Sequence, residues 1–455
     1  MTEFRSYDPT SGRFVLDRPE ASPAELERAL ARSAAAFRTW SRAPLGDRAA
    51  VLRRLGAVLR ARAAADGLLM AEEMGKPASQ GKAEAEKCAW ACEFAADHAE
   101  AWLAPETIAT EARSSFVRHD AMGAILAIMP WNFPFWQLFR FGASALAAGN
   151  VIVLKHAPNV PRCAEAIEAI FAEAGAPEGV LVSVNAAVRD IPGLLEDARV
   201  AAVTLTGSTR AGQAVAAAAG RALKPSVLEL GGSDPFLVLP DADLDRAADF
   251  AARARLQNNG QSCIAAKRFI VVDAVADAFV ERFRAALAAH TVGDPRAPTT
   301  RVGPMARRDL RDELARQVER SVAAGAQCIL GGAPDGGEGF FYPPTLLTGL
   351  QPGMAAWDEE TFGPCAAVRT VPDVEAAIAA ANDSVFGLGA TVFTEDRALA
   401  TRVAGQLECG AVFVNDMVRS DPRMPFGGTK QSGWGRELGR EGMLQFTHAR
   451  SIWIA

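Results

Sequence analysis

Short apolar runs alternate with helix-like segments between residues 123 and 230, and this alternation limits the folds open to the chain. The runs GAILAIMP, NVIVLK, VLVSVN, AAVTLT and SVLEL are typical of strands. The segments FWQLFRFGASALAAG, RCAEAIEAIFAEAG and AGQAVAAAAGRAL between them have helical spacing. Strands that alternate with helices form βαβ units, so we predict an α/β fold with a parallel, doubly wound sheet. The later runs KRFIVV, QCILGG, AAVRTV and ATVFT predict a second α/β region after Leu230.

Helical spacing dominates the chain before residue 105. Ser22 precedes Pro23, an order typical of the N-cap and first position of a helix. Further helix-like sequence ends near Gly75. Residues 106–121 hold two alternating runs around Arg113, which predict a β-hairpin. The last residues, LQFTHARSIWIA, are strand-like.

Composition restricts the partners and the compartment of the chain. Acidic residues number 54 against 48 basic ones, for a net charge of −6. This balance argues against nucleic acid or an anionic membrane surface as a partner. The polar N-terminus resembles no secretory signal, and no long run is apolar enough to span a membrane. We therefore expect a cytoplasmic protein.

The 7 cysteines are scattered and form no CxxC pair. Their spacing predicts neither a disulfide framework nor a metal site. Cys88 and Cys92 lie four residues apart, which favours packing on one face of a helix. Cys263, in LQNNGQSCIAAKR, has no histidine nearby in the sequence. Four roles are open to Cys263: a buried packing residue, a disulfide partner, a metal ligand or a nucleophile.

A nucleophilic cysteine needs a positive neighbour, a helix N-terminus or a base. Glu229 ends the run SVLEL ahead of a Gly-Gly turn, where the carboxyl ends of parallel strands face the ligand crevice. An ordinary strand-end glutamate fits its position equally well. Asn132, in IMPWNFPFWQ, fits either an oxyanion donor, a contribution of roughly 3 kcal/mol, or the cap of the next helix.

Two further strand ends suit a phosphate-bearing ligand. Gly207 and Ser208 follow the run AAVTLT and precede a helix, whose first amides can bind a pyrophosphate. Lys155 ends the run NVIVLK, so it can reach a ribose hydroxyl or a phosphate. Each signal is weak by itself.

Ten motifs in order resemble the aldehyde dehydrogenase superfamily over nearly the whole chain. They are EEMGKP, PWNFP, VLKHAP, TGSTRAG, LELGGSDP, NNGQSC, VGPM, EETFGP, ANDSVFGLGATVFT and PFGGTKQSGWGRELG. The resemblance implies a Rossmann-type cofactor domain (1–105 and 122–230), an α/β catalytic domain (231–430) and a small β oligomerisation element (106–121 and 431–455). It also implies a homodimer or homotetramer.

The resemblance also implies roles for individual residues. Cys263 would attack the aldehyde carbon, Asn132 and the Cys263 N–H would hold the oxyanion, and Glu229 would activate water. NAD or NADP would serve as cofactor. The cofactor-binding residues would be Pro130, Trp131, Lys155, Pro158, Gly207, Ser208, Glu360 and Phe362.

Substrate choice follows from a narrower resemblance to bacterial NAD(P)-dependent succinate-semialdehyde dehydrogenases. Arg140 and Ser420 match residues that bind the substrate carboxylate there, although a surface ion pair would also explain Arg140. Apolar walls would come from Phe133, Trp136 and Phe426. The alternative substrates are glutarate semialdehyde and other aliphatic or aromatic aldehydes. A cofactor-independent thioesterase and a non-catalytic protein are the competing classes.

Three departures from the family pattern affect these expectations. Gln257 stands where many relatives have a second arginine, so it would bind the substrate carboxylate by a hydrogen bond without neutralising its charge. The missing charge would have to come from Arg253, Arg255, Arg419 or Arg423. Pro158 stands where NAD-preferring members have a glutamate, so NADP should be accepted as well as NAD, with help from His156. Ala265 replaces a second cysteine, so we expect no redox switch.

Overall fold

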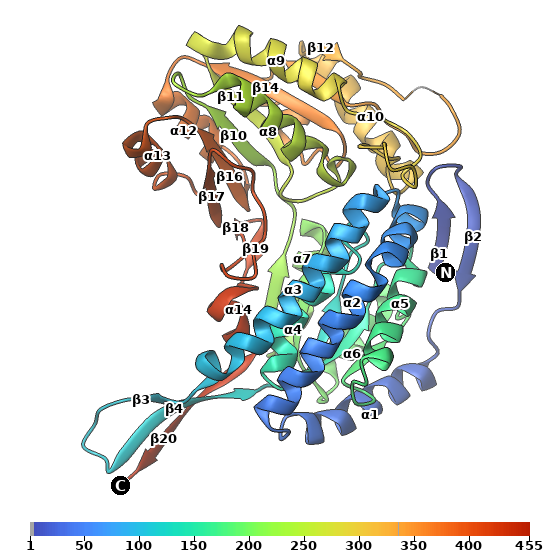
Figure 1. Cartoon of the computed structure of the whole chain (residues 1–455), viewed down its shortest axis with the longest axis vertical. Coiled ribbons are helices and arrows are strands. Elements are labelled where there is room, and N and C mark those ends of the chain that lie inside the picture. The colour runs from blue at the N-terminus through green and yellow to red at the C-terminus, as the bar shows by residue number, and fades with distance from the viewer. Residues whose placement is uncertain (1–3, 335) are drawn as a thin grey trace.

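Two open α/β sheets and a small antiparallel sheet organise the chain, which was analysed as a computed structural model (Figure 1). The structure describes residues 4–334 and 336–455. The predicted α/β fold class is confirmed. None of the described helices combines the length and apolarity that a bilayer crossing requires.

The first sheet has six strands in the order β19-β9-β8-β5-β6-β7. All but β19 run parallel, as the alternating pattern predicts. The strands are β5 (Ala124–Ile128), β6 (Val151–Lys155), β7 (Leu181–Ser183), β8 (Val200–Thr206), β9 (Ser226–Glu229) and β19 (Gly433–Trp434). Its helices are α1 (Pro23–Trp40), α2 (Leu45–Met74), α3 (Ala78–Leu103), α4 (Trp136–Ala147), α5 (Pro161–Glu173), α6 (Ile191–Glu196) and α7 (Thr209–Arg221).

Local signals place the first helices where the sequence predicts them. The Ser22 hydroxyl accepts from the Glu25 N–H, and Glu25 Oε2 accepts from the Ser22 N–H, which forms a capping box at α1. Gly75 ends α2 in the left-handed conformation (φ 77°). The sequence did not predict the hairpin of β1 (Phe4–Asp8) and β2 (Arg13–Arg18) ahead of these helices.

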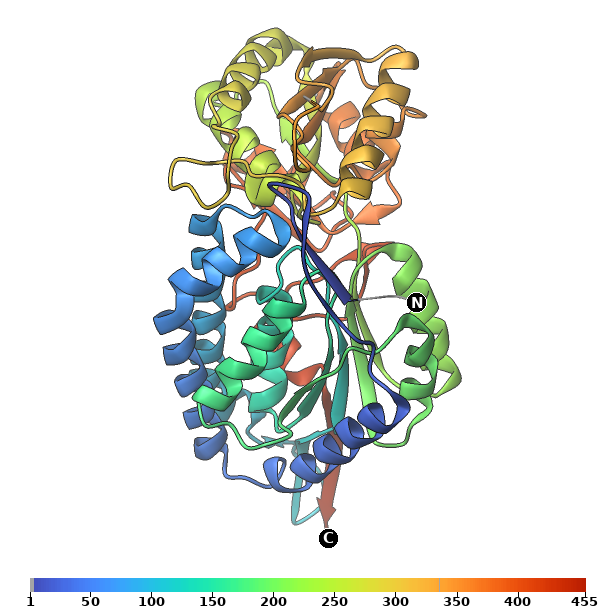
Figure 2. The same ribbon diagram turned by 90° about the vertical axis from the view of Figure 1, so that its right-hand side faces the viewer.

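The second sheet has seven strands in the order β12-β13-β14-β11-β10-β16-β17. They are β10 (Asp234–Val238), β11 (Ala266–Val272), β12 (Gln327–Leu330), β13 (Thr345–Thr348), β14 (Cys365–Val371), β16 (Gly389–Phe393) and β17 (Ala411–Val414). The helices are α8 (Leu244–Leu256), α9 (Ala276–Ala288), α10 (Arg308–Ala323), α11 (Ala355–Asp358), α12 (Val374–Asn382) and α13 (Arg397–Ala404). Figure 2 shows this second α/β region at the top of the molecule. The first sheet and its helices, α2 and α3 among them, lie underneath this region.

The third sheet projects from the body of the molecule (Figure 1). It contains β3 (Glu106–Thr107), β4 (Ser114–Ala121) and β20 (Thr447–Ile454), so the predicted hairpin is present. Other parts of the segment 431–455 lie elsewhere: β19 joins β9, and α14 (Gly439–Leu444) packs on α3 and α4. The short strands β15 (Phe386–Gly387) and β18 (Thr429–Lys430) pair with each other.

A buried carboxylate connects the corner between α2 and α3 to the start of α4. Glu84 pairs with Lys76, and both side chains are almost fully buried. The other oxygen of Glu84 accepts from the backbone N–H groups of Phe135 and Trp136, each at 2.9 Å. Glu84 therefore satisfies the first amides of the helix that carries several predicted site residues.

Removal of one partner of this pair should destabilise the protein. Lys76→Met leaves the Glu84 charge buried without its cation, at a cost of about 3–5 kcal/mol in the free energy of unfolding. Urea unfolding followed by circular dichroism measures it. Lys82→Met, on the helix that carries Glu84, is the control, because the pair of Lys82 with Glu86 is exposed and contributes less than about 1 kcal/mol. Equal losses in the two variants would contradict a structural role for the buried pair.

Candidate active site

The segment that carries Cys263 begins with a tight left-handed turn. Asn258 (φ 53°), Asn259 (φ 58°) and Gly260 (φ 74°) all have positive φ. Asparagine and glycine are the residues that tolerate this conformation best. The Asn258 side chain donates to the carbonyls of Asn132 (2.8 Å) and Gln261 (2.9 Å). The turn is thereby tied to the loop that follows β5.

The second asparagine of the turn holds it against the rest of the molecule. Asn259 Nδ2 donates to the carbonyls of Gly75 (2.8 Å) and Pro304 (2.9 Å). Its Oδ1 accepts from the Gly303 N–H at 2.7 Å. All the polar groups of this buried amide are used, which explains why the NNGQSC motif needs asparagine here.

A buried lysine fixes the backbone on the other side of the cysteine. Lys267 Nζ donates to the carbonyls of Ser262 (3.0 Å), Cys263 (2.9 Å) and Ala265 (3.2 Å). It also lies 3.7 Å from Glu360 Oε1. The Glu360 oxygen in turn accepts from the Gly232 N–H at 3.0 Å. Cys263 is therefore held on a rigid loop.

Cys263 lies where two cavities meet, because it lines both of them. Its thiol is not bonded to another cysteine, and burial raises its pKa to about 12. Among the described residues, no cluster of His, Cys, Asp and Glu is arranged to hold a metal ion. Cys88 and Cys92 are both fully buried in the helical core around α3.

Asn132 lines the same cavity as Cys263. Its Nδ2 donates to the Gln261 carbonyl at 3.1 Å. It does not cap the following helix, which begins at Trp136 and whose first amides are bound by Glu84. The capping alternative is therefore wrong, while the oxyanion role stays a prediction.

Glu229 is the last residue of β9 and is almost fully buried. Neither of its carboxyl oxygens has a hydrogen-bond partner among the described residues. Burial raises the pKa of this carboxyl well above its usual value. The Nη2 of Arg140 lies 3.9 Å from its Oε2. A Cβ at Gly427 would come within 2.9 Å of its Oε1, so a glycine there leaves room for the carboxyl.

Arg140 is buried in α4, so the alternative of a surface ion pair is wrong. Its Nε donates to Glu437, and its Nη2 donates to Thr206 Oγ1 at 3.2 Å. Glu437 reaches this position because β19, just before it, extends the first sheet beside β9. The role of Arg140 as a carboxylate ligand stays a prediction, because its guanidinium already has acidic partners.

One cavity at Cys263 contains most of the predicted cofactor-binding residues. Pro130, Trp131, Gly207, Ser208, Glu360 and Phe362 line it, together with Thr206, Leu230, Gly231 and Leu310. The rings of Trp131 and Phe362 meet edge to face at 5.8 Å. Lys155 is almost fully buried at the end of β6, and Pro158 lines a neighbouring cavity.

His156 cannot serve as a free cation beside Pro158. Its Nε2 donates to the Pro134 carbonyl at 2.8 Å, and its Nδ1 accepts from the Ala157 N–H at 2.8 Å. Burial lowers the pKa of the imidazole to about 4. The expectation that His156 assists a 2′-phosphate is therefore wrong.

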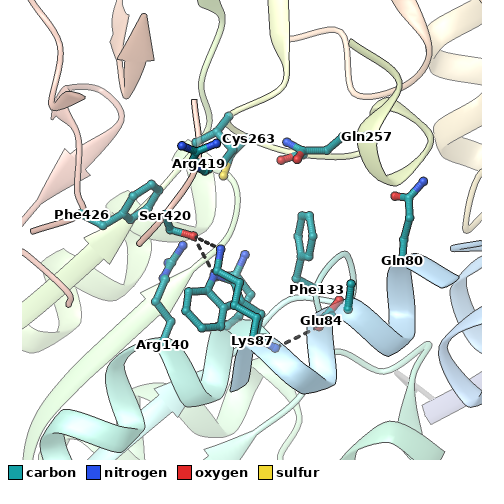
Figure 3. A pocket seen from close by; sticks show the side chains of 15 residues that line it. Gln80, Glu84, Lys87, Phe133, Arg140, Gln257, Cys263, Arg419, Ser420 and Phe426 are labelled. Atoms are coloured by element: carbon teal, nitrogen blue, oxygen red, sulfur yellow. Dashed lines mark hydrogen bonds between the residues drawn. The ribbon is translucent and has the colours of Figure 1, made fainter. Parts of the chain in front are cut away.

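The other cavity brings together all six predicted substrate residues. Phe133, Trp136, Arg140, Gln257, Ser420 and Phe426 line it with Cys263 (Figure 3). Of the four arginines considered as replacements, only Arg419 lines this cavity. Arg255 donates to the Gly260 carbonyl, and Arg253 and Arg423 pair with Asp249 and Asp421.

Sequence analysis missed Lys87, which lines the same cavity. The signal that could have revealed it is the spacing on α3. Lys87 lies three residues after the buried Glu84 and directly before the buried Cys88, so its side chain starts near the buried face of the helix. Gln80 and Glu84 of the same helix also line the cavity.

Comparison with known proteins identifies the family. The aldehyde dehydrogenase family model matches residues 1–452. The chain belongs to this family. Within the family, it is 48% identical to the succinate semialdehyde dehydrogenase [NAD(P)+] Sad of Escherichia coli (strain K12), over 98% of this chain and 97% of that protein. It is also 48% identical to a probable succinate-semialdehyde dehydrogenase [NADP(+)] of Synechocystis, over 99% of each.

Solved structures of aldehyde dehydrogenases and related enzymes have the same fold. The structure of Gox0499, described for its cofactor and substrate selection, has a TM-score of 0.98 at 39% identity and covers 100% of both chains. The succinic semialdehyde dehydrogenase of Streptococcus pyogenes, solved with NADP+, has a TM-score of 0.97 at 33% identity and covers 99% of both.

Burial of the thiol predicts how Cys263 reacts with an alkylating agent when no cofactor is bound. Because its pKa is raised to about 12, the thiolate fraction should increase about tenfold per pH unit from about pH 7 to about pH 9. Iodoacetamide labelling of the Cys263 peptide, quantified by mass spectrometry, measures this increase, and a Cys263→Ala protein gives the background. A labelling rate that does not change with pH would show that the thiolate already forms at neutral pH.

Proposed function

We propose that this aldehyde dehydrogenase oxidises succinate semialdehyde to succinate with NAD+ or NADP+. The observation that carries the proposal is the position of Cys263 at the junction of two cavities. One contains most of the predicted cofactor residues, and the other has apolar walls and basic side chains. Relatives that are 45–48% identical over nearly the whole chain are named for this substrate.

The chain supplies a nucleophile and donors for the first half of the reaction. The Cys263 thiol would lose its proton to water, and the thiolate would attack the aldehyde carbon to form a thiohemiacetal. The oxyanion of this thiohemiacetal would accept from the Asn132 amide and the Cys263 N–H. The carbon bonded to the Cys263 sulfur would then lose a hydride, for which a bound nicotinamide would supply the acceptor, and a thioester would remain on Cys263. The loop around Cys263 is fixed by Asn258 and Lys267, which holds the sulfur in place.

Glu229 is the base that we assign to hydrolysis of the thioester. It would take a proton from water, whose oxygen attacks the thioester carbon and releases succinate and the Cys263 thiol. The raised pKa of its carboxyl makes the ionised form a stronger base. Because Glu229 is not among the residues that line either cavity at Cys263, its side chain would rotate toward the sulfur.

The residues around the cofactor cavity fit a dinucleotide. Ser208 caps α7 by accepting from the Ala211 N–H, and the amides of Thr209 and Arg210 ahead of it would bind a pyrophosphate. Lys155 would bind the adenosine ribose, and burial lowers its pKa to about 8. Glu360 would bind the nicotinamide ribose. Pro158 presents no carboxylate that would repel a 2′-phosphate, which supports use of NADP as well as NAD.

The sheet of β3, β4 and β20 supports a proposal about assembly and location. Its strand β20 pairs with β4 on one side only, and Trp453 and Ile454 at its end are exposed. We propose that this sheet joins subunits into a homodimer or homotetramer. A cytoplasmic location agrees with the composition of the chain.

Initial rates with different aldehydes test the proposed substrate. Succinate semialdehyde should have a kcat/KM at least about tenfold above that of hexanal, which is about 1.4 kcal/mol in transition-state stabilisation. Glutarate semialdehyde should fall between them, and NAD+ and NADP+ are compared in parallel. Equal rates with hexanal would leave an aldehyde dehydrogenase but reject the succinate assignment. Oxidation that persists in Cys263→Ala would reject the mechanism.

The assignment of Glu229 to hydrolysis predicts a burst. Glu229→Gln cannot take a proton from water, so kcat should fall at least about 100-fold. The first turnover should still release one reduced cofactor per active site within the stopped-flow trace. A first turnover that slows as much as kcat would show that Glu229 acts before the thioester forms.

A further inference from the structure

Lys87 and Ser420 meet in the substrate cavity, across from Cys263 (Figure 3). Lys87 Nζ lies 2.8 Å from Ser420 Oγ and 4.2 Å from the centre of the Trp136 ring. The Trp136 Nε1–H donates to the same Oγ at 3.0 Å. A helix residue, a loop residue and an aromatic wall of the cavity therefore form one cluster.

This cluster offers donors to a ligand. A serine hydroxyl has two acceptor lone pairs and one O–H. Lys87 and Trp136 occupy the two lone pairs of Ser420, so its proton must point elsewhere. No acceptor for this proton occurs among the described residues. The ammonium of Lys87 has further N–H groups as well. A carboxylate, which only accepts hydrogen bonds, complements such a cluster.

The cluster also contains a cation that has no acidic partner among the described residues. Within residues 4–334 and 336–455, no carboxylate oxygen lies within 4.0 Å of Lys87 Nζ. The nearby Glu84 is already paired with Lys76 and with two backbone N–H groups. A cation that faces a cavity without a counter-ion has lost part of its hydration and has gained no ion pair that offsets this cost. The entry of an anion is therefore favourable.

Arg140 differs from Lys87 in this respect. Its guanidinium contacts Glu437 and lies 3.9 Å from Glu229. Even when one of these carboxyls is protonated, the other still balances the charge of Arg140. Arg140 can donate a hydrogen bond to a ligand, but it brings no uncompensated charge to the cavity. Arg419, on the rim, is paired with Asp416 at 2.8 Å and is more than half exposed.

We propose that Lys87, together with the hydroxyl of Ser420, binds the carboxylate of the substrate and sets the preference for short semialdehydes. This inference rests on the proposed function. The aldehyde carbon lies at Cys263, the chain of the substrate lies between Phe133 and Phe426, and the carboxylate lies on Lys87. Arg140 is then a positioning residue that acts through Glu437 and Glu229.

Substitution of Lys87 tests this assignment through specificity. Lys87→Met keeps the length of the side chain and removes its charge. The ratio of kcat/KM for succinate semialdehyde to that for hexanal should fall about 100-fold, and succinate should inhibit correspondingly less. Lys82→Met, an exposed lysine on the same helix, should leave both activities unchanged. An unchanged ratio in Lys87→Met would overturn the proposal.

Arg140→Met separates positioning from carboxylate binding. It should lower kcat/KM for succinate semialdehyde and for hexanal by similar factors, because it disturbs Glu229 whatever the substrate is. A selective loss with succinate semialdehyde in Arg140→Met, combined with no selective loss in Lys87→Met, would assign the carboxylate to Arg140. In the wild-type protein, a lack of preference over hexanal would instead reject the proposed function, and the assignment of the substrate carboxylate to Lys87 would be rejected with it.

The wild-type protein gives a second test if Lys87→Met does not fold. Burial lowers the pKa of Lys87 to about 8, whereas Arg140 stays charged. Inhibition by succinate, assayed with hexanal, should weaken between about pH 7 and about pH 9.5 as Lys87 loses its proton. Inhibition that does not change with pH would contradict the proposal.

The other charged or titratable groups around Lys87 are Glu84, Cys88, Arg140, Cys263, Arg419 and Asp421. Burial raises the pKa of both thiols, so they stay protonated over this range.

Discussion

The buried guanidinium of Arg140 holds together two buried carboxyls, Glu229 and Glu437, at the candidate active site. It contacts Glu437 and lies 3.9 Å from Glu229, in a region where all three side chains are almost fully buried. Two acids packed this closely repel each other when both are ionised, and burial raises the pKa of each. Arg140 offsets this repulsion. The charge of Arg140 therefore stabilises the ionised form of Glu229, the proposed base, and is not left over for a substrate carboxylate.

Segments far apart in the sequence build this arrangement. Glu437 is brought beside Glu229 because β19 pairs with β9 in the first sheet. Phe426 and Glu437 also exchange backbone hydrogen bonds of 2.7 and 2.8 Å, which closes the loop between them. The same loop covers the substrate cavity with the ring of Phe426, 4.7 Å from the Arg140 guanidinium. One C-terminal segment thus supports the proposed base, Glu229, and one wall of the proposed substrate site.

The sequence predicts residues at strand ends well, because parallel strands bring their carboxyl ends to one edge of a sheet. Glu229 and Gly207 were found in this way, and the motif resemblance added Glu360 and Phe426. Pairs that join distant segments could not be predicted. Arg140 and Glu437 are 297 residues apart, and Lys87 and Ser420 are 333 apart. Neither pattern nor spacing shows which acid balances a given cation, so the sequence reveals neither the buried partner of Arg140 nor the position of Lys87 in the cavity.

The most direct measurement is a crystal structure of Cys263→Ala with the oxidised cofactor and succinate. The account predicts that the carboxylate remote from residue 263 lies about 2.8 Å from Lys87 Nζ and within hydrogen-bond distance of Ser420 Oγ. The pair of Arg140 with Glu437 should remain intact. A carboxylate bound to Arg140, with Glu437 displaced and Lys87 still on Ser420 alone, would contradict the division of charge on which the account depends.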